Sequence, residues 1–266
     1  ADVVGSTSLL NEVELACIYH EVFTSLKMHT YELRINSRKI LTALAEVCNA
    51  PEKVVAITTA IDKLDKIGIE KVKEELKEKG LDNEQVAKVE TYLTMDNISG
   101  SANNPDKINF LTNFFKDVET GLKGIEELSF LIKHVPAENN IIIDHTLARG
   151  LNYYTGTIFE VKAKGVNLGS IGGGGRYDDL TGLFGVPGIP GVGISFGVDR
   201  IFDVMEELHL FPVDVHTGTQ VLFFNLGKAE SKKAYELMQQ LRDNGIRCEL
   251  YHEELKFDKQ FKYAEK

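Results

Sequence analysis

Residues 169–180 read Gly-Ser-Ile-Gly-Gly-Gly-Gly-Arg-Tyr-Asp-Asp-Leu, and the four consecutive glycines at 172–175 do most to decide the fold. A backbone without side chains lets a flat ligand or a second strand approach closely. A flexible turn between a strand and a helix is the other explanation. No Gly-Lys-Ser/Thr follows the run, and no Gly-x-Gly-x-x-Gly spacing occurs in the chain. We therefore expect neither a Walker nor a Rossmann nucleotide site.

The segment before this run, residues 147–160, reads Leu-Ala-Arg-Gly-Leu-Asn-Tyr-Tyr-Thr-Gly-Thr-Ile-Phe-Glu and is strand-like, but one charged residue and two tyrosines interrupt it. Arg149 beside a glycine is a permanently charged, forked donor that suits a phosphate or carboxylate. Adjacent tyrosines on a strand point to opposite faces, so one of Tyr153 and Tyr154 can pack while the other offers its hydroxyl to a cavity. A surface salt bridge for Arg149 and core packing for both rings is the alternative.

The segment after the run, residues 191–201, reads Gly-Val-Gly-Ile-Ser-Phe-Gly-Val-Asp-Arg-Ile and predicts a buried strand that passes directly into a helix. Arg200 then lies in the first turn of that helix, where a cation opposes the helix dipole. This placement favours an anionic or aromatic partner for Arg200. An ordinary ion pair with Asp199 or a neighbouring acid is the alternative.

Regular patterns continue on both sides of these segments. Apolar spacing predicts a helix over residues 9–27, a strand over 31–35 and a second helix over 38–48. From about residue 51 to 137 the composition shifts to Lys, Glu, Asp, Leu and Ile, which predicts a separate helical module with ion pairs on its exposed faces. A buried strand is predicted at 140–144. After Pro212 and Gly218 we expect a new βαβ unit, with a strand at 221–225, a helix at 229–244 capped by Gly245, and a strand at 246–251.

Composition predicts a soluble protein of two or three domains. The 266 residues are 43% hydrophobic and 26% charged, which is enough to bury a core. No apolar run approaches the roughly 20 residues of a membrane span. Three widely separated cysteines suggest neither a disulfide framework nor a zinc site, so we expect a reducing, cytoplasmic setting. A net charge of −10 argues against a nucleic-acid platform over the whole surface but allows a local RNA-binding patch.

Three of these blocks, in this order and with this spacing, resemble the histidyl-tRNA synthetases. Residues 149–160 are similar to the signature peptide of that family, 172–177 to its second signature, and 193–200 to motif 3 of class II synthetases. Residues 2–5 resemble the segment that follows the motif 2 strands, and 34–38 resemble a strand-to-helix junction of the same fold. The resemblance covers nearly the whole chain.

The resemblance implies an α+β fold in which helices flank a mainly antiparallel sheet, with a helical insertion and the start of an α/β anticodon-binding domain. We expect residues 1–50 and 138–212 to form the catalytic core, 51–137 the insertion module, and 213–266 the beginning of the anticodon-binding domain. Motifs 1 and 2 and the end of the anticodon-binding domain are not found. We therefore expect this chain by itself to be inactive.

The implied activity is that of a histidine–tRNA ligase, which uses ATP, accompanied by Mg²⁺, to form histidyl-adenylate and then transfers histidine to tRNA(His). The full-length enzyme is expected to be a cytoplasmic homodimer with no membrane association. Arg149 would be the catalytic cation at the α-phosphate, because a positioned cation stabilises charge on the phosphoryl oxygens. Arg200 would pack on the adenine and contact the terminal phosphate, with Gly197 beside the ATP.

The resemblance also implies which residues bind histidine. Asp2 and Tyr154 would each hold one imidazole nitrogen, and Tyr153 and Tyr177 would line the pocket. Because an unpaired buried polar atom costs roughly 1 to 3 kcal/mol, such a pair would reject isosteres that lack both nitrogens. Asn152 departs from the Asp that many relatives carry, so no charged role is transferred to it. No metal ligands are expected.

Two other functions share this fold in the same resemblance. One is a regulatory subunit that senses histidine without activating it, and the other is a synthetase-like domain inside a larger regulatory kinase. Such proteins typically lose the signature arginine. The presence of Arg149 and Arg200 and the start of a βαβ unit favours the ligase.

Overall fold

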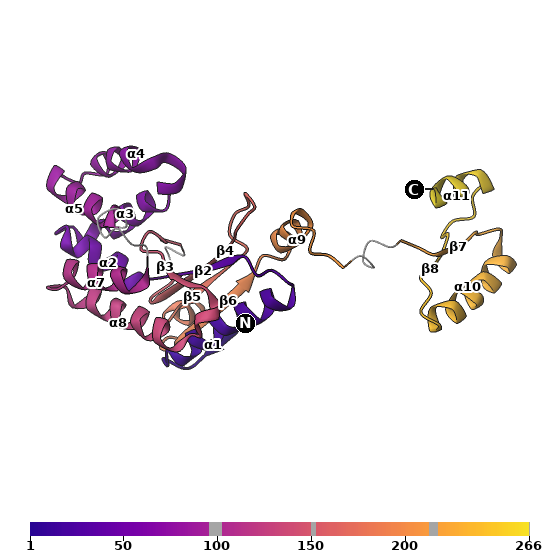
Figure 1. The fold of residues 1–266 in the computed structure, drawn as a ribbon, viewed down its shortest axis with the longest axis horizontal. Helices are drawn as coiled ribbons and strands as arrows, with labels where there is room; N and C mark the ends of the chain where they lie inside the picture. Colours follow the sequence, from indigo (N-terminus) through magenta and orange to yellow (C-terminus); the bar gives the residue numbers. More distant parts are fainter. Residues whose placement is uncertain (96–102, 150–152, 213–217, 266) are drawn as a thin grey trace. The chain divides into compact units, whose positions relative to one another are not determined.

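A six-stranded sheet lies at the centre of Ala1–Leu210, with its strands in the order β1-β6-β5-β4-β2-β3 (Figure 1). All neighbouring strands are antiparallel except β2 and β3, which are parallel. The predicted mainly antiparallel sheet, built from the beginning of the chain and from the residues after 138, is therefore confirmed. The strands are β1 (Asp2–Val4), β2 (Tyr31–Ser37), β3 (Ile141–Ile143), β4 (Thr157–Ala163), β5 (Gly172–Arg176) and β6 (Gly191–Phe196).

The structure is a computed structural model that describes residues 1–95, 103–149, 153–212 and 218–265. Its contacts divide the chain into two compact units, Ala1–Leu210 and Phe211–Lys266. No helix among the described residues is both long enough and apolar enough to cross a membrane.

One face of the sheet is apolar and is covered by α1 (Leu10–Ser25) and α8 (Glu119–His134). Leu33 and Ile35 of β2 are fully buried on this face. On the same face, the rings of Tyr19 and Phe23 in α1 lie 5.1 and 5.9 Å from the ring of Phe196 in β6. Two helices on one face leave the opposite face, which carries the alternating polar residues, available for a site.

The junction of β2 and α2 (Arg38–Val47) is the predicted strand-to-helix passage. Ser37 caps the helix by accepting a hydrogen bond from the Lys39 N–H at 3.3 Å. The strand does not end at Ile35 as predicted but continues through Asn36 and Ser37. Asn36 can be buried because its side-chain amide donates to the carbonyl oxygens of His145 and Leu147, at 3.0 and 2.9 Å.

Helices make up most of residues 51–95 and 103–137, as predicted, and their exposed faces carry ion pairs. Lys73, for example, lies 2.8 Å from Glu90 and 3.4 Å from Glu70. The last helix, α8, packs against α2 and β2. The limits of a separate insertion module therefore stay a prediction. The helices are η1 (Pro51–Lys53), α3 (Val54–Ile61), α4 (Leu64–Glu78), α5 (Asn83–Leu93) and α7 (Asn104–Phe114), and η2 (Ala137–Asn139) follows α8.

The second unit contains the predicted βαβ arrangement. β7 (Val221–Phe223) and β8 (Cys248–Leu250) are parallel, and α10 (Lys228–Asp243) connects them. Gly245 follows the helix with φ +76°, a left-handed conformation that glycine adopts without strain. A last helix, α11 (Phe257–Ala264), completes the described residues of this unit.

Candidate functional site

On the polar face of β4, β5 and β6 several residues are glycines, and their backbone, which carries no side chains, forms the floor of the site. Gly173 pairs with Glu160 of β4 on one side and with Ser195 of β6 on the other. A Cβ atom at Gly173 would meet only the carbonyl oxygen of Phe159, at 3.5 Å. The glycine run is thus a strand that leaves space above Gly173, and the alternative of a flexible turn is wrong.

Other glycines on this face lie beneath side chains that the sequence analysis singled out. A Cβ at Gly175 would lie 2.9 Å from the ring of Tyr154, and one at Gly191 would overlap the ring of Tyr177. These two tyrosines can lie flat on the sheet only because nothing projects beneath them. Because these glycines have no side chains, the cavity above them is deeper than it would be over other residues.

The first cavity over this floor has a volume of about 470 Å³ and contains all four predicted histidine-binding residues. The Tyr177 hydroxyl donates a hydrogen bond to Asp2 Oδ1 at 2.5 Å. The Tyr153 hydroxyl donates to that of Tyr154 at 3.3 Å, and the two rings lie 4.4 Å apart. The cavity therefore presents one carboxylate and three phenols, supplied by β1, by the end of β5 and by the chain before β4.

The expectation that Tyr153 and Tyr154 point to opposite faces of a strand is wrong. β4 begins only at Thr157, the residue that pairs with Ser37. β2 turns into α2 at Arg38, whose N–H donates to Gly156 O at 2.8 Å. No β2 residue is therefore left to pair with the chain before Thr157, and both tyrosines line the same cavity.

Burial and hydrogen bonding raise the pKa of both Tyr154 and Tyr177 above the ordinary value of a phenol. Burial, together with the neighbouring Asp2 carboxylate, raises the pKa of Tyr177 to about 12. Burial and the adjacent Tyr153 hydroxyl raise the pKa of Tyr154 well above its ordinary value. The cavity thus holds hydroxyl donors around a single carboxylate.

A second cavity of about 550 Å³ adjoins the first and is the cationic end of the groove. Arg149, Arg200 and Lys66 line it together with Glu160. The two cavities have five lining residues in common: Tyr153, Tyr154, Gly173, Gly174 and Ser195. A third hollow of about 350 Å³ extends along the start of α9 (Val198–Glu207) and is lined by Gly197 and Arg200. All the predicted site residues therefore lie along one groove on one face of the sheet.

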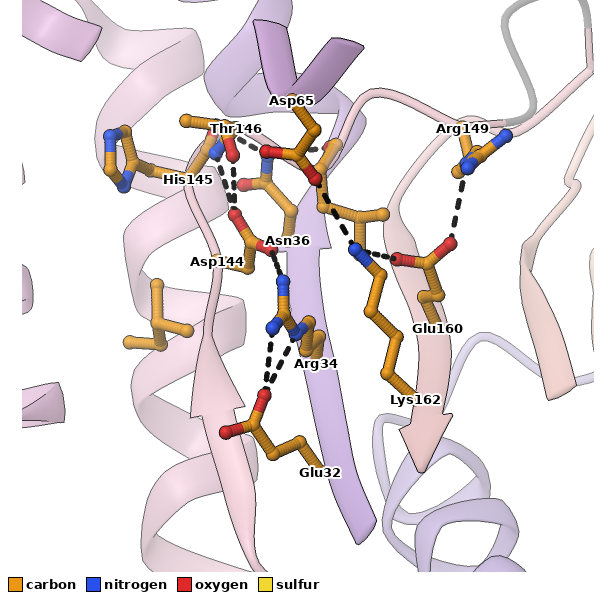
Figure 2. Close-up of polar contacts among 12 residues, drawn as sticks. Glu32, Arg34, Asn36, Asp65, Asp144, His145, Thr146, Arg149, Glu160 and Lys162 are labelled. Atoms are coloured by element: carbon orange, nitrogen blue, oxygen red, sulfur yellow. Dashed lines mark hydrogen bonds and ion pairs between the residues drawn. The ribbon is translucent and has the colours of Figure 1, made fainter. Parts of the chain in front are cut away.

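Arg149 forms the ion pairs of the alternative explanation, and it also borders the second cavity, so its role as an anion-binding cation stays a prediction. Its Nε atom lies 3.3 Å from Glu160 Oε1, a contact that Figure 2 shows, and 3.6 Å from Asp62 Oδ1, so it forms ion pairs. Its side chain is also half exposed and borders the second cavity. Asn152, like the Gly150 that adjoins Arg149, lies outside the described residues.

Arg200 occupies the first turn of α9, where the sequence placed it. Its Nη1 donates to the carbonyl oxygen of Ser170 at 2.7 Å. In the described part of the chain it forms no ion pair, so the alternative of a pair with Asp199 is wrong. The guanidinium remains exposed beside two hollows, and its charge is available to an anion.

Two residues of the groove were missed by the sequence analysis. Lys66 comes from α4, more than 80 residues before Arg149, and no local pattern connects the two. Glu160 is only 4% exposed and lies between Arg149 and Lys162. An acid directly between Phe159 and Val161 in a buried part of the strand was the available signal, because such a residue requires a charged partner.

A third charged residue of these motifs, Arg176, is structural. It donates to both carboxylate oxygens of the fully buried Glu12, at 2.5 and 2.7 Å, and to the carbonyl oxygen of Ser6 at 3.1 Å. The ion pair between Arg176 and Glu12 links β5 to α1. Among the described residues no cluster of His, Cys, Asp and Glu side chains could hold a metal ion.

Comparison with known proteins accounts for this arrangement. The sequence matches the family model of histidyl-tRNA synthetase over residues 1–201 and that of an anticodon-binding domain over residues 220–266. The chain belongs to the histidyl-tRNA synthetase family. The predicted βαβ unit after residue 219 is accordingly the anticodon-binding type of domain.

Similar histidyl-tRNA synthetases cover the whole chain. The histidine–tRNA ligases of Bacteroides fragilis and Porphyromonas gingivalis are 50% and 48% identical to it, over 99% of the chain. The chain spans 58% and 57% of the length of these relatives. The crystal structure of histidyl-tRNA synthetase from a Nostoc species matches with a TM-score of 0.73 at 32% identity, over 99% of this chain and 63% of that one.

A more distant structure shares only the fold. A Bacillus halodurans protein described as an ATP phosphoribosyltransferase regulatory subunit/histidyl-tRNA synthetase matches with a TM-score of 0.68 at 18% identity, over 94% of this chain and 61% of that one. The fold alone therefore does not separate a ligase from a regulatory subunit, and the distinction must come from the residues of the groove.

Proposed function

We propose that this chain carries the histidine-binding and ATP-binding groups of a histidine–tRNA ligase. The observation that supports the proposal is the groove itself, which joins an acid and three phenols at one end to two arginines at the other, over a glycine floor. The first end suits an imidazole and the second suits a polyphosphate. Both ends border Gly173, so a histidine and an ATP bound there would meet above it.

At the first end, the hydrogen bonds leave one acceptor and one donor for a neutral imidazole. Asp2 Oδ1 accepts from Tyr177, and its second oxygen can accept the imidazole N–H. Tyr154 accepts from Tyr153 and has its own proton to donate to the other nitrogen. This arrangement would reject isosteres that lack either nitrogen, because a buried group would stay unpaired.

At the second end, the reaction begins when a histidine carboxylate oxygen attacks the α-phosphorus of ATP. The new oxygen–phosphorus bond gives histidyl-adenylate, and cleavage of the bond between the α- and β-phosphates releases pyrophosphate. Arg149 would stabilise the charge on the α-phosphoryl oxygens, and Arg200 would hold the adenine and terminal phosphate. In the second step a ribose hydroxyl of tRNA(His) attacks the histidyl carbonyl, and AMP leaves.

Mg²⁺ would enter this groove as the companion of ATP. The carboxylate that lines the cationic end, Glu160, is already engaged by Arg149 and Lys162, at 3.3 and 3.7 Å. These residues supply cationic charge and do not form a set of metal ligands. The proposed working form is a cytoplasmic homodimer that includes the remaining part of the enzyme.

The alternative, a subunit that only senses histidine, needs the first end of the groove but not the second. Arg149 and Arg200 at one cavity favour the ligase. Histidine-dependent exchange of pyrophosphate into ATP by the complete protein tests the proposal. Histidine binding without such exchange would establish the regulatory function instead.

The sharpest test of the active-site assignment is Arg149→Ala in the complete enzyme. Loss of the charge at the α-phosphate should slow adenylate formation about 10²- to 10³-fold, with a much smaller effect on histidine binding. Arg149→Lys should restore little, because it keeps the charge but loses the planar fork. If Arg149 only forms a structural ion pair, thermal unfolding will shift while the folded variant exchanges pyrophosphate at nearly the normal rate.

A further inference from the structure

The junction of α3 and α4 lies against the loop that carries Arg149. Asp62 follows the end of α3, and Asp65 lies in the first turn of α4. This junction encloses a small hollow together with the segment after β3 and with β4. Its charged lining residues include Asp62, Asp65, Arg149, Glu160 and Lys162.

Two carboxylates approach the guanidinium of Arg149 at the same atom. Nε lies 3.3 Å from Glu160 Oε1 and 3.6 Å from Asp62 Oδ1. Arg149 donates no hydrogen bond within the described residues, and Nε is its nearest nitrogen in both ion pairs. Both carboxylates thus contact the guanidinium group of Arg149 at Nε. Its two terminal amino groups, the outer edge of the group, lie farther along the side chain, which borders the second cavity.

The α3–α4 junction also contacts β4 itself, through Asp65. Lys162 lies 3.4 Å from Asp65 and 3.7 Å from the other carboxylate oxygen of Glu160 (Figure 2). The Asp65 side chain is 76% exposed, whereas that of Asp62 is 33% exposed. Solvent screens the Asp65 pair more strongly, so the Asp62 contact is the stronger constraint.

We propose that Asp62 is a positioning residue for Arg149, and that adenylate formation depends on the α3–α4 junction through this contact. The inference rests on the proposed function, because it assumes that Arg149 acts on the α-phosphate. It adds to the site a second residue, besides Lys66, from the helical segment between β2 and β3.

The physical reason is the freedom of a half-exposed arginine. The Arg149 side chain is 52% exposed, and its long stem has several rotatable bonds. Glu160 alone fixes one contact to Nε, and the guanidinium can still turn about it. A second carboxylate on the same atom, from another element, restricts that rotation and keeps the outer amino groups at one place in the cavity.

The test compares Asp62→Asn with Asp65→Asn in the complete enzyme. Each variant removes one negative charge from the same junction and keeps the side-chain shape, but only Asp62 contacts Arg149. We expect Asp62→Asn to lower kcat for pyrophosphate exchange about 10- to 100-fold while KM for histidine stays unchanged. Asp65→Asn should leave both constants near the wild-type values. Thermal unfolding of both variants shows whether either is simply misfolded.

A double substitution then identifies the route of the effect. If Asp62 acts through Arg149, Asp62→Asn will cause no additional loss of activity in an Arg149→Ala background. An equal loss in both backgrounds, a normal kcat for Asp62→Asn, or equal effects of the two Asp→Asn substitutions would overturn the inference. An inactive wild-type enzyme, in contrast, would refute the proposed function itself.

Discussion

Gly173→Ala should reduce activity without reducing stability, because this glycine is open on the side of the groove. An added Cβ would meet only Phe159 O, at 3.5 Å, which is an ordinary contact. Alanine also loses less backbone entropy than glycine in a strand, so the free energy of unfolding should rise by about 0.5 to 1 kcal/mol. The methyl group would instead occupy the point where the two cavities meet.

The size of the functional loss follows from the place of the methyl group. Adding or removing one methylene group in a filled pocket changes the binding free energy of the transition state by about 1 to 3 kcal/mol. This corresponds to a change of about 10- to 200-fold in kcat/KM. Both substrates border Gly173 in the proposed arrangement, so the loss should appear with respect to histidine and with respect to ATP. A substitution at only one end of the groove would affect one substrate more than the other.

Gly174→Ala is the matched control. The neighbouring glycine faces the adjacent strand, and a Cβ there would overlap the carbonyl oxygen of Gly193 and lie 2.8 Å from Ile194 Cα. β6 would have to shift, so we expect a loss of stability of about 3 kcal/mol, the upper end for overpacked sites. Pyrophosphate exchange and chemical denaturation are measured on both variants. Gly173→Ala with normal kcat/KM for both substrates would refute this reasoning.

Three further predictions concern single contacts. Arg176→Ala should lower the free energy of unfolding by about 3 to 5 kcal/mol in chemical denaturation, because it leaves Glu12 charged and fully buried without its partner. The raised pKa of Tyr177, about 12 beside Asp2, means that its stabilising contribution is complete below pH 10 and is lost as the pH rises to 12; denaturation curves of wild type and Tyr177→Phe should therefore converge over that interval. Lys66→Ala should raise KM for ATP about fivefold at low salt and less at high salt, as expected for an exposed cation.

Local patterns predicted the strands and helices where one interaction dominates. The strand-to-helix passage at residues 34–38 could be predicted because an alternating apolar pattern changes to helical spacing at one point. The end of β2 was placed two residues early because Asn36 is polar. Its partners, the carbonyl oxygens of His145 and Leu147, lie more than 100 residues away in the chain. A local pattern cannot anticipate that such a side chain will be satisfied when buried.

The same limit explains the outcome at the site. The resemblance named Asp2, Tyr154 and Tyr177, and the structure brings them to one cavity, although their roles stay predictions. Whether Tyr153 and Tyr154 lie on a strand at all depends on where β2 ends, because β4 can pair with β2 only where β2 remains extended. Asp62 could not be identified at all, since an acid after a helix in a Lys/Glu-rich segment is usually a solvated residue.

The position of β1 at the edge of the sheet has a consequence during synthesis. Its partner is β6, and Asp2 and its hydrogen-bond partner Tyr177 are 175 residues apart. A ribosome adds about 5 to 20 residues per second, so on the order of 10 to 35 s passes between the synthesis of these two residues. The helices between them make local contacts and can form during that interval. The cavity proposed for histidine can thus close only after β6 is synthesised, and a nascent chain halted before residue 191 should be helical yet lack this proposed binding site.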